Sequence, residues 1–195
     1  MGLDSIELVV EIERYFGIQI PDREAEKIIT VQAMVDTVAR HLNITDDSTE
    51  LRDNILERVN QAFLKLGITS AVIPLTANIS PFLSPNNKEV WMAFKRELHL
   101  DVPKPETLKP ESSKLIDKIK NAVNWKPMYD WTSITVDQFV TAICASNHEV
   151  LIDRTQIKST YEIYVAVIAI TVEKIGVDYF EITPEKSFAD DLGVS

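Results

Sequence analysis

The chain of 195 residues contains an internal repeat that starts and ends in the middle of a unit. Three pairs of segments match, at offsets of 82, 105 and 109 positions respectively. The matched pairs are 17–22 with 99–104, 30–31 with 135–136, and 66–68 with 175–177. Any one pairing is weak, but collinear matches at fixed spacing indicate a repeated structural unit.

These matches divide the chain into half a unit, one whole unit and the missing half. Residues 1–45 are the back half of a unit, 48–150 are a complete copy, and 153–195 are the front half. A half unit is too small to bury a core alone, so we expect the halves to pair, within one chain or between chains. Pairing within the chain is favoured by the high effective concentration of a tethered partner. The chain is either a segment of a longer tandem array of such units or a circularly permuted unit.

Hydrophobic residues recur at helical spacing along most of the chain, which predicts an all-α fold. The first helix is predicted over 4–16, with Asp4 as its N-cap and Glu7 at capping-box spacing. Gly17 is expected to end this helix. Its expected buried stripe consists of Ile6, Val9, Val10, Ile12 and Phe16.

Two further helices are marked by their caps. Thr30 is predicted to cap a helix that runs to Leu42. Ser159 and Glu162 have capping-box spacing and open a helix that stops before Gly176. The interior of this last helix is rich in valine and isoleucine, a pattern that periodicity alone does not distinguish from a buried strand. The caps and the length favour a helix.

Charge and hydropathy exclude several classes of protein. A net charge of −10 argues against electrostatic binding of nucleic acid or of an anionic membrane, and it favours basic partners. The longest apolar stretch, 163–172, is shorter than a membrane span requires. The N-terminus has no basic-then-apolar leader, so we expect a cytoplasmic protein without a membrane span.

Groups that could bind a metal or act as catalysts are few. The single cysteine, Cys144, excludes an intrachain disulfide and a cysteine-cluster metal site, and we expect it to be a core residue. His41, His99 and His148 lack the spacing of a zinc-binding helix, so surface or helix-end positions are expected. We therefore expect no metal site and no enzymatic activity.

Two groups of motifs resemble the acyl carrier protein family. Residues 4–9, Asp-Ser-Ile-Glu-Leu-Val, and 16–22, Phe-Gly-Ile-Gln-Ile-Pro-Asp, are similar to the second half of a carrier. Residues 175–177, 182–185 and 188–193 are similar to its first half. The resemblance implies units that are four-helix bundles, one of them split between the two ends of the chain.

The resemblance also implies a cofactor. In the family, the second helix starts at a serine that receives 4′-phosphopantetheine from coenzyme A, and the motif places that serine at Ser5, next to Asp4. A phosphodiester there would meet the positive end of the helix dipole. The thiol of the arm would carry acyl groups as thioesters in fatty-acid or polyketide-like synthesis, and a peptidyl or aryl carrier would differ only in cargo. Ile6 stands where the family most often has leucine.

The partners implied by the resemblance are a phosphopantetheinyl transferase and acyl-processing synthase enzymes. Acidic side chains along the second helix, here Glu7, Glu11 and Glu13, would meet basic patches on those enzymes. For Glu11 and Glu13 individually, a plain solvated surface is the simpler interpretation.

The middle copy departs from the family pattern. Asn86 and Asn87 replace the Asp-Ser pair, so no hydroxyl is available there for the arm. This copy also carries an insertion over 105–131, and its aromatic residues are expected to pack in the core rather than to form a docking surface. A carrier-shaped unit without the serine leaves a second function open for the whole chain, a protein–protein interaction module that is not phosphopantetheinylated.

Overall fold

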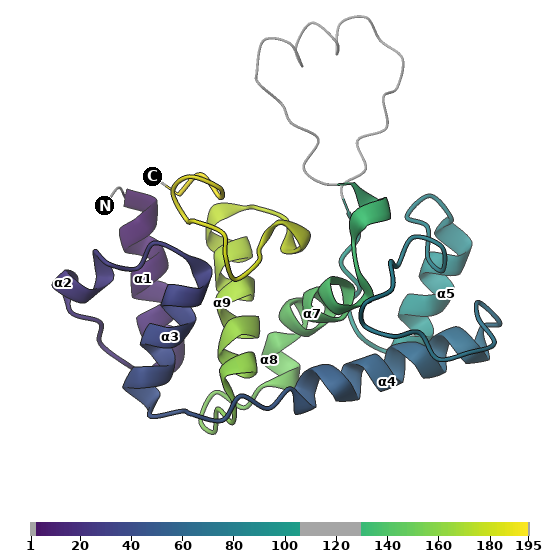
Figure 1. The fold of residues 1–195 in the computed structure, drawn as a ribbon, viewed down its shortest axis with the longest axis horizontal. Helices are drawn as coiled ribbons and strands as arrows, with labels where there is room; N and C mark the ends of the chain where they lie inside the picture. The colour runs from purple at the N-terminus through teal and green to yellow at the C-terminus, as the bar shows by residue number, and fades with distance from the viewer. Residues whose placement is uncertain (1–2, 106–129, 195) are drawn as a thin grey trace, which may run out of the picture.

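The computed structural model describes residues 3–105 and 130–194, and within these ranges the chain is helical, with two isolated bridges and no strand (Figure 1). The α-helices are α1 (Leu3–Phe16), α2 (Asp22–Ala25), α3 (Val31–Leu42), α4 (Glu50–Lys65), α5 (Lys88–Leu98), α7 (Val136–Ser146), α8 (His148–Leu151) and α9 (Thr160–Ile175). Two short 3-10 helices are η1 (Trp131–Ser133) and η2 (Tyr179–Glu181). The all-α prediction is confirmed. Most of the insertion predicted over 105–131 lies outside the described residues.

Helix α1 begins earlier than the sequence predicts. It includes Leu3, so Asp4 and Ser5 lie inside its first turn, and the predicted N-cap position of Asp4 is wrong. The predicted end is confirmed, because Gly17 follows the helix with a φ of 65°, a left-handed conformation that glycine adopts without strain.

The buried face of α1 also differs from the predicted stripe. Leu8, Ile12 and Phe16 are buried, and their spacing of four residues places them on one face of the helix. Ile6 and Val10 are 47% and 43% exposed. Each lies two residues from Leu8, which turns it to the opposite side of the helix. The predicted stripe therefore combined residues from two faces.

Helix α9 lies at the centre of the fold (Figure 1). It packs against α1 and α3 on one side and against α7 on the other, with a smaller contact to α4. Its buried side chains consequently surround the helix: Ile163, Val165, Ala166, Val167, Ile168, Ala169 and Ile170. The valine- and isoleucine-rich segment is therefore a helix enclosed by other helices. Within the described ranges, no helix is long and apolar enough to cross a bilayer.

The N-terminus of α9 has half of the predicted capping box. The Ser159 hydroxyl accepts a hydrogen bond from the Glu162 amide at 3.3 Å. The Glu162 carboxylate accepts instead from the Lys158 amide, at 2.7 Å, one residue before the N-cap. The polar side chain of Glu162 is therefore satisfied although it is buried.

One set of backbone hydrogen bonds occurs twice, at positions related by the offsets of the sequence repeat. At the start of α3 the bonds run from Val31 N–H to Lys186 O, from Gln32 N–H to Pro184 O, and from Phe188 N–H to Ile29 O, at 3.0, 2.8 and 3.0 Å. At the start of α7 they run from Val136 N–H to Ala77 O, from Asp137 N–H to Leu75 O, and from Ile79 N–H to Ile134 O, at 2.8, 3.0 and 2.9 Å. Residues 153–194 therefore contact the N-terminal segment within one chain, through bonds of the same pattern as those inside the middle copy.

Helix caps repeat as well. Thr30 and Thr135 cap α3 and α7, each accepting from the amide of the third helical residue at 3.2 Å. The predicted Thr30 cap is confirmed. After α5, His99 takes the left-handed conformation that Gly17 takes after α1, with a φ of 54°. His99 thus occupies the helix end expected for it.

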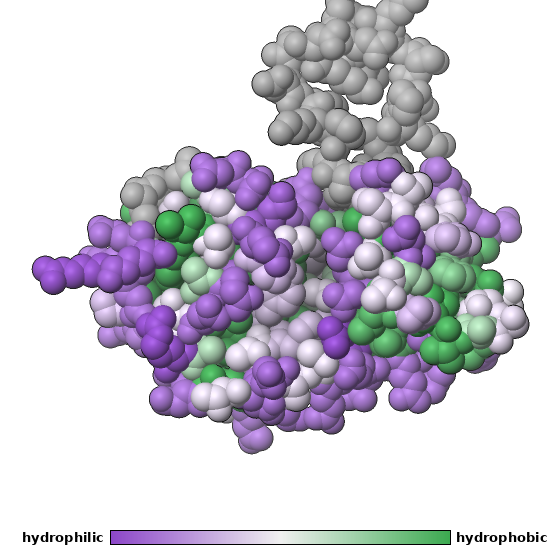
Figure 2. Space-filling model, in the orientation of Figure 1, coloured by the Kyte–Doolittle hydropathy of each residue, from purple (hydrophilic) through white to green (hydrophobic). Residues whose placement is uncertain are grey.

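The face of the molecule drawn in Figure 2 is mostly hydrophilic, in agreement with the high net charge. Hydrophobic surface gathers at the end of the molecule formed by α5 and the last part of α4. Leu64 on α4, Val72 in the loop after it, and Met92 on α5 are exposed hydrophobic residues of these segments.

Candidate functional site

Ser5 lies half-buried in the first turn of α1 and lines an apolar pocket of about 240 Å³. The walls of this pocket come from α1, from α2 with the turn after it, and from α3: Leu8, Val9, Ala25, Ile28, Ile29 and Met34. Of the lining residues within 3–105 and 130–194, Glu26, which is exposed, is the only other polar one. Such a pocket can shelter a short hydrocarbon chain, at roughly 0.8 kcal/mol for each buried CH₂ group.

The C-terminal segment completes this pocket. Phe188 and Ala189 line it, and the Phe188 amide donates a hydrogen bond to Ile29 O at 3.0 Å, which ties this wall to the turn before α3. The sequence did not identify these two residues as site residues. The repeat could have done so, because Phe188 is the counterpart of Ile79, which is fully buried in the middle copy.

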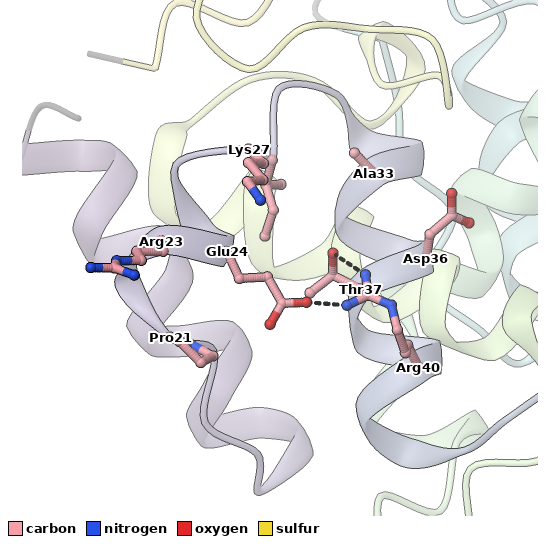
Figure 3. A pocket seen from close by; sticks show the side chains of 9 residues that line it. Pro21, Arg23, Glu24, Lys27, Ala33, Asp36, Thr37 and Arg40 are labelled. Carbon is pink, nitrogen blue, oxygen red and sulfur yellow. Dashed lines mark hydrogen bonds and ion pairs between the residues drawn. The ribbon is translucent and has the colours of Figure 1, made fainter.

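On the other side of Ile28, a polar hollow of about 630 Å³ separates α2 from α3 (Figure 3). Glu24 reaches across from α2, and its carboxylate binds the guanidinium of Arg40 on α3. The second carboxylate oxygen lies 2.9 Å from Nε2 of His41. Ile28 lines both the polar hollow and the apolar pocket, so the segment that carries Glu24 also forms a wall of the apolar pocket. The contacts of Glu24 with α3 therefore hold this wall in place.

Acid is expected to weaken this attachment. Hydrogen bonds from His41 and then from Arg40 lower the pKa of the Glu24 carboxyl. A lowered pKa in the folded state stabilises the protein above the pKa of the unfolded chain, and this stabilisation is lost as the pH falls through the lowered value. Glu24→Gln should therefore lower the melting temperature near neutral pH, and the difference from wild type should shrink as the pH falls below the ordinary pKa of a glutamate.

Thermal unfolding followed by circular dichroism across this pH range measures the difference. Glu26→Gln is the matched control, since Glu26 is exposed on the same segment. A difference that stayed constant with pH would show that ionised Glu24 does not stabilise the α2 segment.

The three acidic residues singled out on α1 have different surroundings. Glu7 is exposed. Glu11 has a side chain only 23% exposed and forms ion pairs with Arg14 at 2.9 Å and with Lys174 of α9 at 3.0 Å. Glu13 accepts a hydrogen bond from the Ile20 amide at 2.6 Å, which fixes the connector after α1. Glu11 and Glu13 are therefore partly exposed acids that also bind other groups of this chain.

The scattered cysteine and histidines do not form a site. Cys144 is fully buried, as predicted, and burial raises the pKa of its thiol to about 12, so it is not a nucleophilic thiolate. His148 begins α8, one of the helix-end positions expected for the histidines, and it is buried there, with Nδ1 3.0 Å from Ala145 O. Among residues 3–105 and 130–194, no three histidine, cysteine or acidic side chains are grouped to hold a metal ion.

In the middle copy, other side chains occupy the equivalent positions. Asn87, the counterpart of Ser5, is the N-cap of α5 and accepts from the Val90 amide at 3.2 Å. Trp91 and Phe139, the counterparts of the pocket residues Val9 and Met34, lie with ring centroids 6.5 Å apart. Both rings are buried, and each is larger than the side chain at the equivalent position beside Ser5.

Comparison with known proteins adds one finding. Over 40 residues, this chain is 56% identical to an acyl carrier protein of Rubrobacter xylanophilus. The chain contains an acyl-carrier-like region. The match covers 20% of this chain and 49% of the relative, so the chain spans about half the length of that curated protein. No family model and no solved structure matches the chain.

Proposed function

We propose that residues 3–45 and 153–194 form one acyl carrier unit, and that Ser5 carries 4′-phosphopantetheine. The observation that carries the proposal is the position of the Ser5 side chain beside an apolar pocket whose last wall is Phe188 and Ala189. The repeated hydrogen bonds at α3 and α7 support a unit assembled from both ends of the chain. The 40-residue similarity to an acyl carrier protein supports the carrier role.

The residues around Ser5 suit an attached phosphodiester. Ser5 is in the first turn of α1, where the positive end of the helix dipole favours a negative charge. When bound, the group supplies a thiol that holds an acyl chain as a thioester. Leu8, Met34 and Phe188 would then exclude water from the chain in the pocket. The protein itself would catalyse no reaction, and would serve enzymes of fatty-acid or polyketide-like synthesis.

In this proposal the middle copy carries no cargo. Asn87 stands at the place of Ser5, and the larger aromatic side chains of Trp91 and Phe139 stand at the places of two pocket residues. Its contribution would be structural, through the contact of α7 with α9.

One observation favours the second function, an interaction module that is not modified. The resemblance implies a serine at the start of the helix, but α1 begins at Leu3 and Ser5 is its third residue. Ser5 as a residue is also half-buried rather than exposed. As an interaction module, the same fold and the same exposed surfaces would bind synthase enzymes without an attached phosphopantetheine group.

Modification separates the two functions. The full chain is incubated with a phosphopantetheinyl transferase and coenzyme A, and its intact mass is measured. The carrier proposal expects a gain of one phosphopantetheine group per chain. No gain with several transferases would leave the interaction module, and a gain of two groups would contradict the inert middle copy.

Partner enzymes should interact electrostatically with the exposed negative charge on α1. Because Glu7 is exposed, Glu7→Lys should slow the transferase on the order of several-fold at low salt, without changing the helical signal. The rate of modification checks this, with Glu57→Lys on the exposed face of α4 as the matched charge reversal. Equal rates for the two variants would show that Glu7 is not part of the docking surface.

A further inference from the structure

Another pocket, of about 330 Å³ and partly open to solvent, lies where the middle copy meets the C-terminal segment. Helices α4 and α7 contribute one side of it, and α9, η2 and residues 182–184 contribute the other. It shares no lining residue with the pocket beside Ser5. Neither the middle copy nor the C-terminal segment forms this pocket alone, because each contributes one of its two sides.

Aromatic rings form much of its wall. Tyr161 and Tyr164 lie on α9 with ring centroids 6.3 Å apart, and Tyr179 and Phe180 come from η2. The Tyr161 hydroxyl is hydrogen-bonded to that of Thr141 at 2.9 Å, so the contact it offers a ligand is chiefly its ring. Burial raises the pKa of Tyr161 and Tyr164, which keeps both phenols neutral.

Carboxylates outnumber cations around these rings. Among the residues that the structure describes, Arg52 is the one basic side chain in the lining, and its guanidinium is already bound to Asp137 at 3.3 Å and to Asp53 at 3.4 Å. Glu185 and Asp178 add negative charge near Tyr164 and Tyr179, and each raises the pKa of that phenol further. An anion entering the pocket would therefore meet net repulsion.

The pocket wall already contacts one cation of this chain. The guanidinium carbon of Arg52 lies 5.8 Å from the centroid of the Tyr161 ring, within the range of a cation–π interaction. Aromatic faces combined with nearby carboxylates are the groups that recognise guanidinium and alkylammonium ions. The chain as a whole, with a net charge of −10, attracts such ions.

We propose that this pocket binds an organic cation, a guanidinium or an alkylammonium group. The cation is either a free small amine or a lysine or arginine side chain of a partner protein. Tyr164, Tyr179 and Asp137 would contact it, next to Arg52, which would compete for the same ring and carboxylate.

Small alkyl probes of different charge test the charge preference directly. Binding of butylguanidinium, neutral butylurea and anionic butyrate to the full chain is measured by NMR chemical-shift changes. Butylguanidinium should bind about tenfold more tightly than butylurea, and butyrate should not bind. Equal binding of the guanidinium and the urea, or preferential binding of butyrate, would overturn the proposal.

Arg52 provides the sharpest variant. Arg52→Gln removes the competing internal cation, so it should tighten butylguanidinium binding, whereas a pocket for anions would lose affinity. Asp137→Asn should weaken binding several-fold, and Asp47→Asn, an exposed acid elsewhere, is the matched control. Equal weakening by both acid variants would mean that only the overall charge attracts the probe, and would refute a site.

The source of the cation is a separate arm of the experiment. A short peptide with one arginine and a free dialkylamine are compared with butylguanidinium in competition. Displacement by the peptide alone identifies a partner's side chain, and displacement by the free amine identifies a small molecule. Failure of both to displace the probe would overturn the proposal. None of these measurements depends on modification of Ser5.

Discussion

Removal of residues 153–195 should unfold the N-terminal segment and destabilise the middle copy as well. Helix α9 packs against α1 and α3 and, on its other side, against α7. Without it, Leu8, Ile12 and Phe16 on α1 would be exposed to water, at about 25 cal/mol per Å² of apolar surface. The truncated chain should lose much of its helical signal and unfold at lower urea concentration. A middle copy with unchanged stability would contradict the central position of α9.

A single substitution tests the same point in the full chain. Ile168 is 1% exposed in the middle of α9, so Ile168→Ala should reduce the free energy of unfolding by about 2–5 kcal/mol. Val150→Ala is the matched control because Val150 is 82% exposed, and its effect should stay within about 0.5 kcal/mol. Urea unfolding measures both. Two similar values would mean that α9 is not part of the core.

The second large effect concerns modification. Ser5→Ala should reduce the gain of phosphopantetheine from one group per chain to none, because the hydroxyl oxygen forms the phosphodiester. The exposed Ser48→Ala is the control and should be modified like wild type. Circular dichroism verifies that Ser5→Ala remains folded, which its place in the first turn of α1 leads us to expect. A modified Ser5→Ala chain would exclude Ser5 as the attachment site.

The parts of the fold that were predictable from sequence depend on local signals. Thr30, Ser159, Gly17 and Gly176 mark helix ends because capping and left-handed conformations have strong residue preferences. The repeat offsets likewise relate residues that form equivalent hydrogen bonds at α3 and α7. These signals do not depend on what surrounds a helix.

The wrong predictions concern side chains whose burial or hydrogen bonding depends on neighbouring elements of the fold. Ile6 and Val10 looked like core residues, but α9 covers the face of α1 that carries Leu8 and Ile12. Glu13 looked like a surface acid, yet its carboxylate accepts the Ile20 amide seven residues along the chain. Helical periodicity identifies an apolar face but does not say which neighbour covers it.

The candidate site was predictable only in part. The motif located Ser5 on α1, but Phe188 and Ala189 are close to Ser5 only after the two ends of the chain pack together. The pocket with Tyr164 and Arg52 depends on the contact between α4, α7 and α9, which no single-segment pattern encodes.

Peptide mapping of the modified wild-type chain tests the carrier proposal most directly. After treatment with transferase and coenzyme A, the protein is digested and the phosphopantetheine mass is located by tandem mass spectrometry. The expected result is that the added mass resides on Ser5, in the first turn of α1, and on no other residue. An arm on any other residue, or no arm at all, would contradict the proposal.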